Sequence, residues 1–109
     1  MKISGEIIRG RGKGRRLGFP TINIILDKKI EGGVYAGIAR TGGKKYKTGI
    51  FINPDKQLLE AHLIGFCGDL YGREIEIEIG EKVRDVMKFD GDEKLKKQIK
   101  RDVDAIRNL

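Results

Sequence analysis

Glutamate and isoleucine alternate without interruption from Glu74 to Ile79. Successive side chains of a β-strand point to opposite faces, so this pattern places every isoleucine on one face and every glutamate on the other. Such a strand needs a packed core on its apolar face and water on its charged face. The segment therefore predicts a half-buried strand and favours a mainly β fold.

Five other segments have the composition of strands, because they combine β-branched and apolar residues and are separated by turn residues. The six predicted strands are 3–8, 21–26, 34–39, 45–52, 58–66 and 74–79. Sixteen glycines, about twice the usual frequency of roughly 7%, also suit a turn-rich β protein. The segment 83–89 has an ambiguous pattern.

The C-terminal segment has a different period. Apolar residues recur there at helical spacing, at Leu95, Ile99, Val103 and Ile106. This spacing predicts an amphipathic helix over 93–107, with Asp90 and Asp92 as candidate N-caps. Because closure removes exposed sheet edges, we predict a single mainly β domain. It is a six-stranded antiparallel, Greek-key-like closed barrel with one C-terminal α-helix against its outside or mouth.

The formal net charge of +7 favours anionic partners such as nucleotides, nucleic acids or acidic surfaces. The single cysteine, Cys67, excludes an internal disulfide. No apolar run approaches the roughly 20 residues of a membrane-spanning helix. The N-terminus also lacks the apolar stretch of a signal peptide. We therefore expect a cytoplasmic protein without a membrane partner.

Glycine occupies every second position across Gly10, Gly12 and Gly14, in a stretch that is otherwise mostly basic. Backbone N–H groups in such a stretch can form an anion-binding concavity, and Arg15 beside them can add contacts to phosphate. The stretch is neither a Walker A loop nor a dinucleotide fingerprint, because a predicted strand follows it instead of a helix. The same composition also fits a flexible basic loop, such as those found in RNA-binding proteins.

Thr21 and Asn23 stand two residues apart on a predicted strand, so their side chains share one face. Each offers a neutral oxygen, and Mg²⁺ often takes only one or two oxygen ligands from the protein while phosphates and water supply the rest. A basic phosphate-binding loop that leads directly into two oxygen ligands would suit a nucleotide–magnesium site. The alternative is that both side chains form hydrogen bonds within a turn.

Glu60 and His62 also alternate on one face of a predicted strand. A carboxylate on a rigid strand can accept the proton of a substrate hydroxyl, and the only histidine could orient it or simply pack. A solvated outward face explains such a pair equally well. The sequence contains no cluster of histidine and cysteine with the spacing of a zinc site.

In combination, these motifs are similar to the ATP-dependent riboflavin kinase (flavokinase) family of bacteria and eukaryotes. The matching motifs are Gly10 through Asn23 with its Gly-Phe-Pro-Thr-x-Asn segment, Gly33-Val34-Tyr35, Asn53-Pro54, Glu60-Ala61-His62-Leu63, Asp69-Leu70-Tyr71-Gly72, Arg84 with Lys88-Phe89-Asp90, and Gln98-Ile99 with Asp102-Val103. The resemblance covers nearly the whole chain. It implies the family's six-stranded antiparallel barrel with a C-terminal helix. Many bacterial members carry an adenylyltransferase domain ahead of the kinase, whereas here we expect a single kinase domain over residues 1–109.

The resemblance also implies roles for individual residues. By position these are Glu60 as the catalytic carboxylate; Gly10, Gly12, Gly14, Arg15, Leu63 and Tyr71 in nucleotide binding; Thr21 and Asn23 as ligands of Mg²⁺, or of another divalent ion such as Zn²⁺ or Mn²⁺; and Arg84 and Met87 in flavin binding. The chain departs from the family pattern at Val86, where glutamate is usual. It departs again at Asp55, where threonine or an aromatic residue is usual.

The implied reaction transfers the γ-phosphoryl group of ATP to the 5′-hydroxyl of riboflavin, giving FMN and ADP, in a monomer without a nucleic-acid partner. Other hypotheses are a flavokinase that uses CTP, a degenerate member that only binds flavin, and a non-enzymatic basic β-barrel that binds nucleic acid. Binding of single strands favours clustered aromatic residues, whereas the four Phe and three Tyr are dispersed here and Trp is absent.

Overall fold

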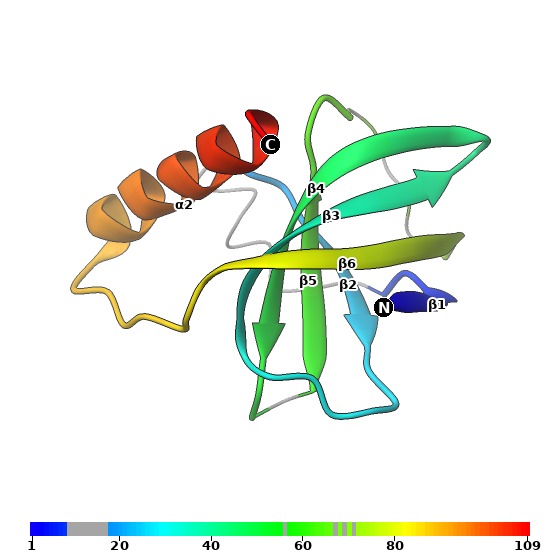
Figure 1. Cartoon of the computed structure of the whole chain (residues 1–109), viewed down its shortest axis with the longest axis horizontal. Helices are drawn as coiled ribbons and strands as arrows, with labels where there is room; N and C mark the ends of the chain where they lie inside the picture. The colour runs from blue at the N-terminus through cyan, green and yellow to red at the C-terminus, as the bar shows by residue number, and fades with distance from the viewer. Residues whose placement is uncertain (9–17, 56, 67, 69, 71) are drawn as a thin grey trace.

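The computed structural model describes residues 1–8, 18–55, 57–66, 68, 70 and 72–109. Within these ranges the chain forms six strands and one C-terminal helix (Figure 1). The strands are β1 (Lys2–Glu6), β2 (Ile22–Ile25), β3 (Gly33–Thr41), β4 (Lys44–Asn53), β5 (Leu58–Leu63) and β6 (Glu74–Arg84), and the helix is α2 (Asp92–Arg107).

All strand pairs are antiparallel, and the strands follow the order β1-β6-β3-β4-β5-β2. The two outer strands of this order approach each other where Ile8 forms a bridge with Asn23, and the Ile8 N–H donates to the Asn23 carbonyl at 2.8 Å. This contact brings the sheet nearly to closure. The prediction of a six-stranded antiparallel barrel with one C-terminal helix is confirmed.

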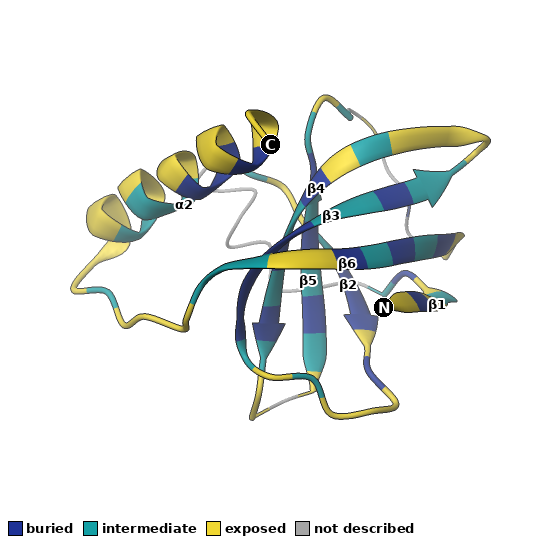
Figure 2. Ribbon diagram, in the orientation of Figure 1, coloured by how far each residue is buried: buried dark blue, intermediate teal, exposed yellow. Residues whose placement is uncertain are grey.

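The alternating segment lies in β6 as predicted (Figure 2). Ile75, Ile77 and Ile79 are buried inside the barrel, whereas Glu74 is exposed on the other face. The interior is otherwise aliphatic. Its fully buried side chains include Ile24, Ile50, Ile52, Leu59 and Ala61. Burial of these side chains is the main stabilising contribution to the barrel, because each contributes about 1.5–3 kcal/mol when removed from water.

Strand β6 continues five residues beyond its predicted end, to Arg84, and so includes the start of the ambiguous segment 83–89. The extension pairs with β3 through register shifts on both sides of Tyr35. Such irregularities bend a strand and increase its twist. The alternation of Glu and Ile ends at Ile79, where the regular pairing of β6 with β3 also ends. The strand itself continues beyond this point.

The predicted N-caps of the helix, Asp90 and Asp92, are wrong. Gly91 occupies the cap with φ 100° and makes no side-chain capping bond, and Asp92 is already the first helical residue. A positive φ of this kind is adopted readily by glycine and rarely by aspartate, which explains the choice of residue. Asp92 and Glu93 instead stabilise the first turn by their charge, since anions favour the N-terminal end of the helix dipole.

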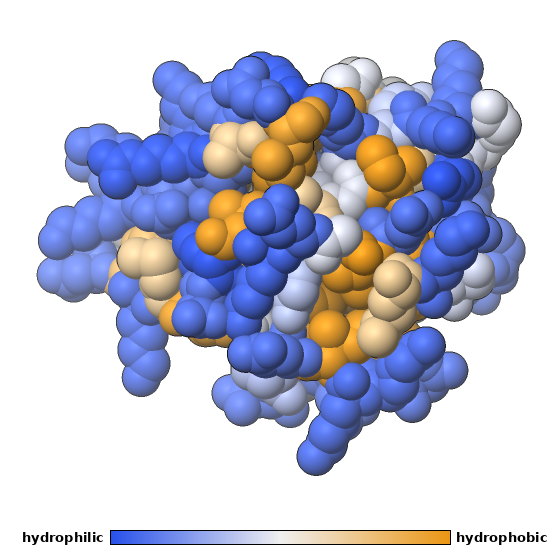
Figure 3. Space-filling model, viewed as in Figure 1, coloured by the Kyte–Doolittle hydropathy of each residue, from blue (hydrophilic) through white to orange (hydrophobic). Residues whose placement is uncertain are grey.

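Helix α2 lies against the outside of the barrel, as predicted (Figures 1 and 2). Its Ile106 packs into a second apolar cluster with Val34 and Ala36 of β3. Lys47 of β4 binds the C-terminal end of the helix. Its Nζ donates to the main-chain oxygens of Arg107 and Leu109 at 2.9 and 2.7 Å. Figure 3 shows hydrophilic side chains over most of this side of the molecule and apolar ones gathered in its middle. Among the described residues, no helix has the length and apolar character needed to cross a membrane.

We expect Gly37→Ala to destabilise the barrel by about 1–3 kcal/mol, the usual cost of overpacking. A Cβ atom at Gly37 would lie 2.6 Å from the Glu78 carbonyl oxygen and would overlap Ile50. Urea denaturation measures the change. Gly49→Ala in the neighbouring strand is the matched control, because its Cβ would meet only Ile106, at 3.4 Å. Equal stability of the two variants would contradict this account.

Candidate active site

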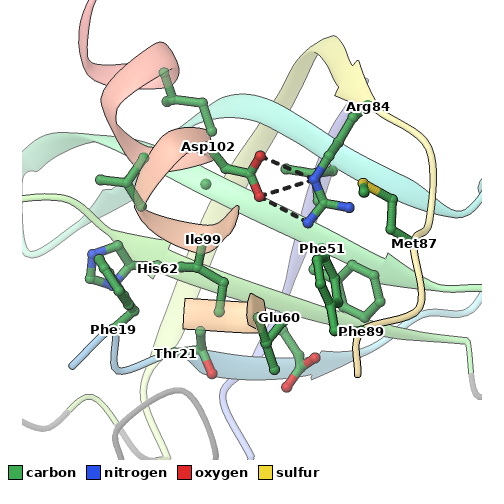
Figure 4. Close-up of a pocket in the computed structure, with 15 residues that line it drawn as sticks. Phe19, Thr21, Phe51, Glu60, His62, Arg84, Met87, Phe89, Ile99 and Asp102 are labelled. Atoms are coloured by element: carbon green, nitrogen blue, oxygen red, sulfur yellow. Dashed lines mark hydrogen bonds and ion pairs between the residues drawn. The ribbon is translucent and has the colours of Figure 1, made fainter. Parts of the chain in front are cut away.

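A cavity of about 360 Å³ separates α2 from the outer face of the barrel (Figure 4). Its volume lies within the range of roughly 300–1,000 Å³ that is typical of small-molecule sites. The wall consists of Phe19, Thr21, Val34, Gly49, Phe51, Glu60, His62, Arg84, Met87, Phe89, Leu95, Ile99, Asp102, Val103 and Ile106. Most of these residues are apolar, and none comes from the barrel interior.

The polar groups of the cavity gather at two opposite ends. Figure 4 shows Thr21 and Glu60 at one end and the Arg84–Asp102 pair at the other, with Phe51 and Phe89 along the wall between them. Flat aromatic walls favour a flat ligand, because stacked or edge-on ring contacts add to the burial of apolar area. The arrangement can therefore hold an aromatic ring system whose polar substituents extend to both ends.

One predicted metal ligand, Asn23, and the predicted base, Glu60, lie on one face of adjacent strands. Asn23 of β2 is directly opposite Glu60 of β5 in the antiparallel ladder. Residues paired in this way have Cβ atoms about 4.5–5.5 Å apart and point to the same side. Thr21 was predicted to lie on the strand, but β2 begins at Ile22. Thr21 nevertheless lines the same cavity as Glu60, whereas Asn23 is not part of its wall.

Asn23 is buried, with 4% of its surface exposed, and its Oδ1 has no hydrogen-bond partner among the described residues. A buried acceptor without a partner costs about 1–3 kcal/mol. Such an atom therefore needs an explanation, for example an ion or a water molecule that binds to it. A hard divalent cation prefers oxygen ligands of this kind. The described residues contain no cluster of three His, Cys, Asp or Glu side chains suited to a metal. Asn23 and Thr21 therefore fit a cation that takes its remaining ligands from phosphate and water.

His62 connects the strand of Glu60 to the turn that precedes Thr21. Its Nδ1 lies 2.8 Å from the Pro20 carbonyl oxygen, and its ring meets Phe19 edge-on at 5.7 Å between centroids. Because a carbonyl oxygen only accepts, Nδ1 carries the proton in this contact. The histidine thus holds residues 19–20 in place where regular pairing of β2 has not yet begun.

Arg84, predicted to contact flavin, lies at the end of β6 and forms a bidentate pair with Asp102 of α2. Its Nη2 donates to Oδ2 at 2.9 Å, and its Nε lies 3.0 and 3.1 Å from the two carboxylate oxygens. Gln98, one turn earlier, donates to Oδ1 at 3.0 Å. No role had been predicted for Asp102 itself. The available signal was a carboxylate on the apolar side of the helix, next to Val103.

The connection from β6 to α2 carries Met87 and Phe89 into the cavity wall. Met87, the other residue predicted to contact flavin, is 48% exposed there. Lys82 anchors the start of this connection through ion pairs with Asp85 and with Glu31 of the β2–β3 loop. Hydrogen bonds to Asp85 and then Glu31 raise the pKa of Lys82, and the ammonium group in turn lowers the pKa of Asp85. These contacts join the end of β6 to the β2–β3 loop.

A second cavity, of about 250 Å³, lies on the other side of Thr21. Its wall consists of Pro20, Thr21, Ile22, Ala61, Leu63, Phe66, Gly68 and Leu70. Leu63, predicted on the nucleotide side, is part of this wall. Thr21 belongs to both cavities, so they meet at the predicted metal site. The other predicted nucleotide-binding residues, Gly10, Gly12, Gly14, Arg15 and Tyr71, lie outside the described residues.

The sequence model of one protein family, described as flavokinase and riboflavin kinase, matches residues 1–109. The chain belongs to the riboflavin kinase family. The resemblance inferred from the motifs is thereby confirmed.

Two similar curated proteins are longer than this chain. A bifunctional riboflavin kinase/FMN adenylyltransferase of Haemophilus influenzae is 37% identical over 113 residues, which are 95% of this chain and 37% of that protein. An RNA-binding riboflavin kinase of Bacillus subtilis, RibR, is 37% identical over 115 residues, which are 95% of this chain and 49% of that protein. The chain thus spans less than half the length of these relatives.

Solved structures agree on the fold. A protein of Streptococcus pneumoniae titled as a macrolide-efflux protein superposes with a TM-score of 0.83 at 26% identity, over 98% of this chain and 36% of that chain. A riboflavin kinase of Trypanosoma brucei superposes with a TM-score of 0.70 at 23% identity, over 98% of this chain and 74% of that chain. At 23% identity, the second similarity establishes the fold alone.

We expect Asn23→Leu to raise the free energy of unfolding by about 1 kcal/mol in the absence of ligands. Removal of an unpartnered buried oxygen relieves its desolvation cost. Urea denaturation without divalent ions measures the effect. Asn53→Leu is the control with the opposite sign, because Asn53 Oδ1 accepts from the Asp55 N–H at 3.0 Å. A comparable loss of stability in both variants would show that the Asn23 oxygen is bonded.

Proposed function

We propose that this protein is a riboflavin kinase that transfers the γ-phosphoryl group of ATP to the 5′-hydroxyl of riboflavin, giving FMN and ADP. The observation that carries the proposal is the meeting of two cavities at Thr21, with Asn23 and Glu60 paired across β2 and β5 beside it. Phosphoryl transfer requires chiefly that donor and acceptor are positioned in line and that charge is stabilised. Two cavities that share Thr21 would place donor and acceptor next to each other, and this arrangement supports the proposal.

Riboflavin takes the larger cavity in this proposal. Its flat ring lies between the barrel and α2, where Phe51 and Phe89 supply aromatic contact, and Arg84 and Met87 line the far part of the wall. The ribityl chain then extends toward Thr21 and Glu60. The placement of polar groups at the two opposite ends of the cavity supports this orientation.

The nucleotide takes the smaller cavity, with its base against Leu63 and its phosphates directed toward Thr21. Thr21 and Asn23 hold Mg²⁺, which neutralises developing charge on the phosphate oxygens when bound. The glycine positions Gly10, Gly12 and Gly14, with Arg15 beside them and Tyr71 on the base side, complete this half of the proposal. Its support is that the described neighbours of segment 9–17 reach the site: Ile8 bridges to Asn23, and the chain returns through Pro20.

Glu60 accepts the proton of the 5′-hydroxyl as that oxygen bonds to the γ-phosphorus. Its place on the regular part of β5, opposite Asn23, supports this role, because a base must be held within hydrogen-bond distance of the proton it removes. His62 acts indirectly, by holding the turn before Thr21 through the Pro20 carbonyl.

We expect Glu60→Gln to lower kcat by about 10²–10⁴-fold, the usual contribution of a positioned base, and to leave nucleotide and flavin binding within about threefold. Formation of FMN, followed by chromatography, measures the rate, and quenching of flavin fluorescence measures binding. Glu74→Gln, on the exposed face of β6, is the matched control and should retain full activity. An unchanged kcat in Glu60→Gln would remove Glu60 from the mechanism.

We expect Mg²⁺ and ATP together to stabilise the unmodified protein by about 2.7 kcal/mol at one hundred times the dissociation constant. Asn23→Leu should lose most of this stabilisation, although it is the more stable variant without ligands. Thermal unfolding with and without EDTA measures the difference, and CTP and GTP in the same assay show which nucleotide binds most tightly. Equal stabilisation of both proteins would exclude Asn23 as a ligand of the metal.

A further inference from the structure

The end of the larger cavity opposite Glu60 is formed by a charged pair that the reaction itself does not require (Figure 4). The Arg84 and Asp102 side chains are 16% and 9% exposed, and both line the cavity. Buried charges are normally paired because an isolated one is costly to desolvate. Here the pair joins β6 to α2 and at the same time forms a wall of the binding site.

Asp102 determines where the guanidinium points. Its two oxygens receive Arg84 Nε and Nη2, and Gln98 donates to one of them from the same helix. Arg84 Nη1 donates to the Asp85 carbonyl at 3.0 Å, and Phe89 lies 5.7 Å from the guanidinium carbon. Five contacts thus fix one orientation of a side chain that would otherwise be flexible.

The guanidinium group of Arg84, although fixed, still has N–H groups that can donate to a ligand. Arginine has five N–H groups, and the contacts to Asp102 and Asp85 use three of them. One N–H on Nη1 and one on Nη2 remain without a partner among the described residues. Because the Asp102 carboxylate cancels the positive charge, this end of the cavity offers donors without net charge. Such a surface favours a neutral acceptor such as a carbonyl oxygen over a phosphate.

We propose that Asp102 is a positioning residue that sets the orientation of the flavin. It neutralises the charge of Arg84 and holds the guanidinium so that its free N–H groups donate to the pyrimidine edge of the ring system. This inference rests on the proposed function. The pyrimidine edge of a flavin carries two carbonyl oxygens, whereas the opposite, benzenoid edge carries only methyl groups. With the pyrimidine edge at Arg84, a carbonyl oxygen of that edge can accept from the free N–H groups, and the ribityl chain of the central ring extends toward Glu60.

The test compares three ligands on two proteins. The ligands are riboflavin, its N3-methyl derivative, which blocks the pyrimidine edge, and an 8-dimethylamino derivative, which alters the benzenoid edge. Dissociation constants are measured by fluorescence quenching without nucleotide, for the unmodified protein and for Asp102→Asn. We expect N3-methylation to weaken binding about tenfold or more in the unmodified protein and less than about threefold in Asp102→Asn, a coupling of the size found between groups in contact. The 8-substitution should cost the same factor in both.

Two further variants separate positioning from support of the fold. Arg84→Met/Asp102→Leu replaces the whole pair with apolar side chains, a change that is often neutral for stability. This double variant should remain folded, and N3-methylation and the 8-substitution should weaken its flavin binding by similar factors. It replaces Asp102→Asn in the comparison if that variant unfolds. Asp104→Asn is the matched control, since it makes the same charge change on the exposed side of α2 and should bind all three flavins as the unmodified protein does.

An equal loss from N3-methylation in the unmodified protein and in the variants would overturn the role of Asp102. In that case the flavin would still bind, and the proposed kinase activity would stand. A complete lack of riboflavin binding by the unmodified protein would instead overturn the proposed function, and this inference with it.

Discussion

The register of β2 on β5 is the constraint on which the site depends. Ile22 and Ile24 pair with Ala61 and Leu59 on the core side of the sheet, and this arrangement places Asn23 beside Glu60 on the other side. A slip of one residue would turn the isoleucines toward solvent and Asn23 into the aliphatic interior. The cost of exposing two large apolar side chains therefore fixes the position of two polar ones.

The outer face of the barrel retains a cavity because α2 covers it incompletely. The helix packs closely at Ile106, near its C-terminal end, where Lys47 also fastens the chain. Toward its N-terminal end, Leu95 and Ile99 face the cavity instead of the sheet. The pair of Arg84 and Asp102 bridges this space at one place. The same apolar stripe thus serves as packing surface at one end and as cavity wall at the other.

Sequence periodicity predicted those parts of the fold that depend only on which face of a strand or helix is buried. The alternation at Glu74–Ile79 and the helical spacing from Leu95 onward each state which face is buried, and both are observed. The extension of β6 to Arg84 was not predictable, because it depends on register shifts against β3. At the start of the helix, the positive φ of the cap residue favoured Gly91 over the two predicted aspartates.

The candidate site likewise combines features that the sequence predicted with features that it did not. The sequence pointed to Thr21, Asn23 and Glu60, of which Asn23 pairs with Glu60 and Thr21 lines the same cavity as Glu60. The contact of Asp102 with Arg84 and the cavity itself arise instead from docking between elements distant in sequence.

The distribution of charge relates these features to one another. Segment 9–17 contains five basic and no acidic residues in a chain whose net charge is +7, and its described neighbours lead to the end of the larger cavity that holds Thr21. At the opposite end, Asp102 neutralises Arg84. A cation is useful where a triphosphate binds, since the field of fixed charges attracts anions and offsets their repulsion. It would be harmful beneath a neutral ring, because it would also attract the phosphorylated product. Neutral donors at one end and basic residues next to the other would favour a substrate that is uncharged where it is recognised and becomes an anion where it reacts.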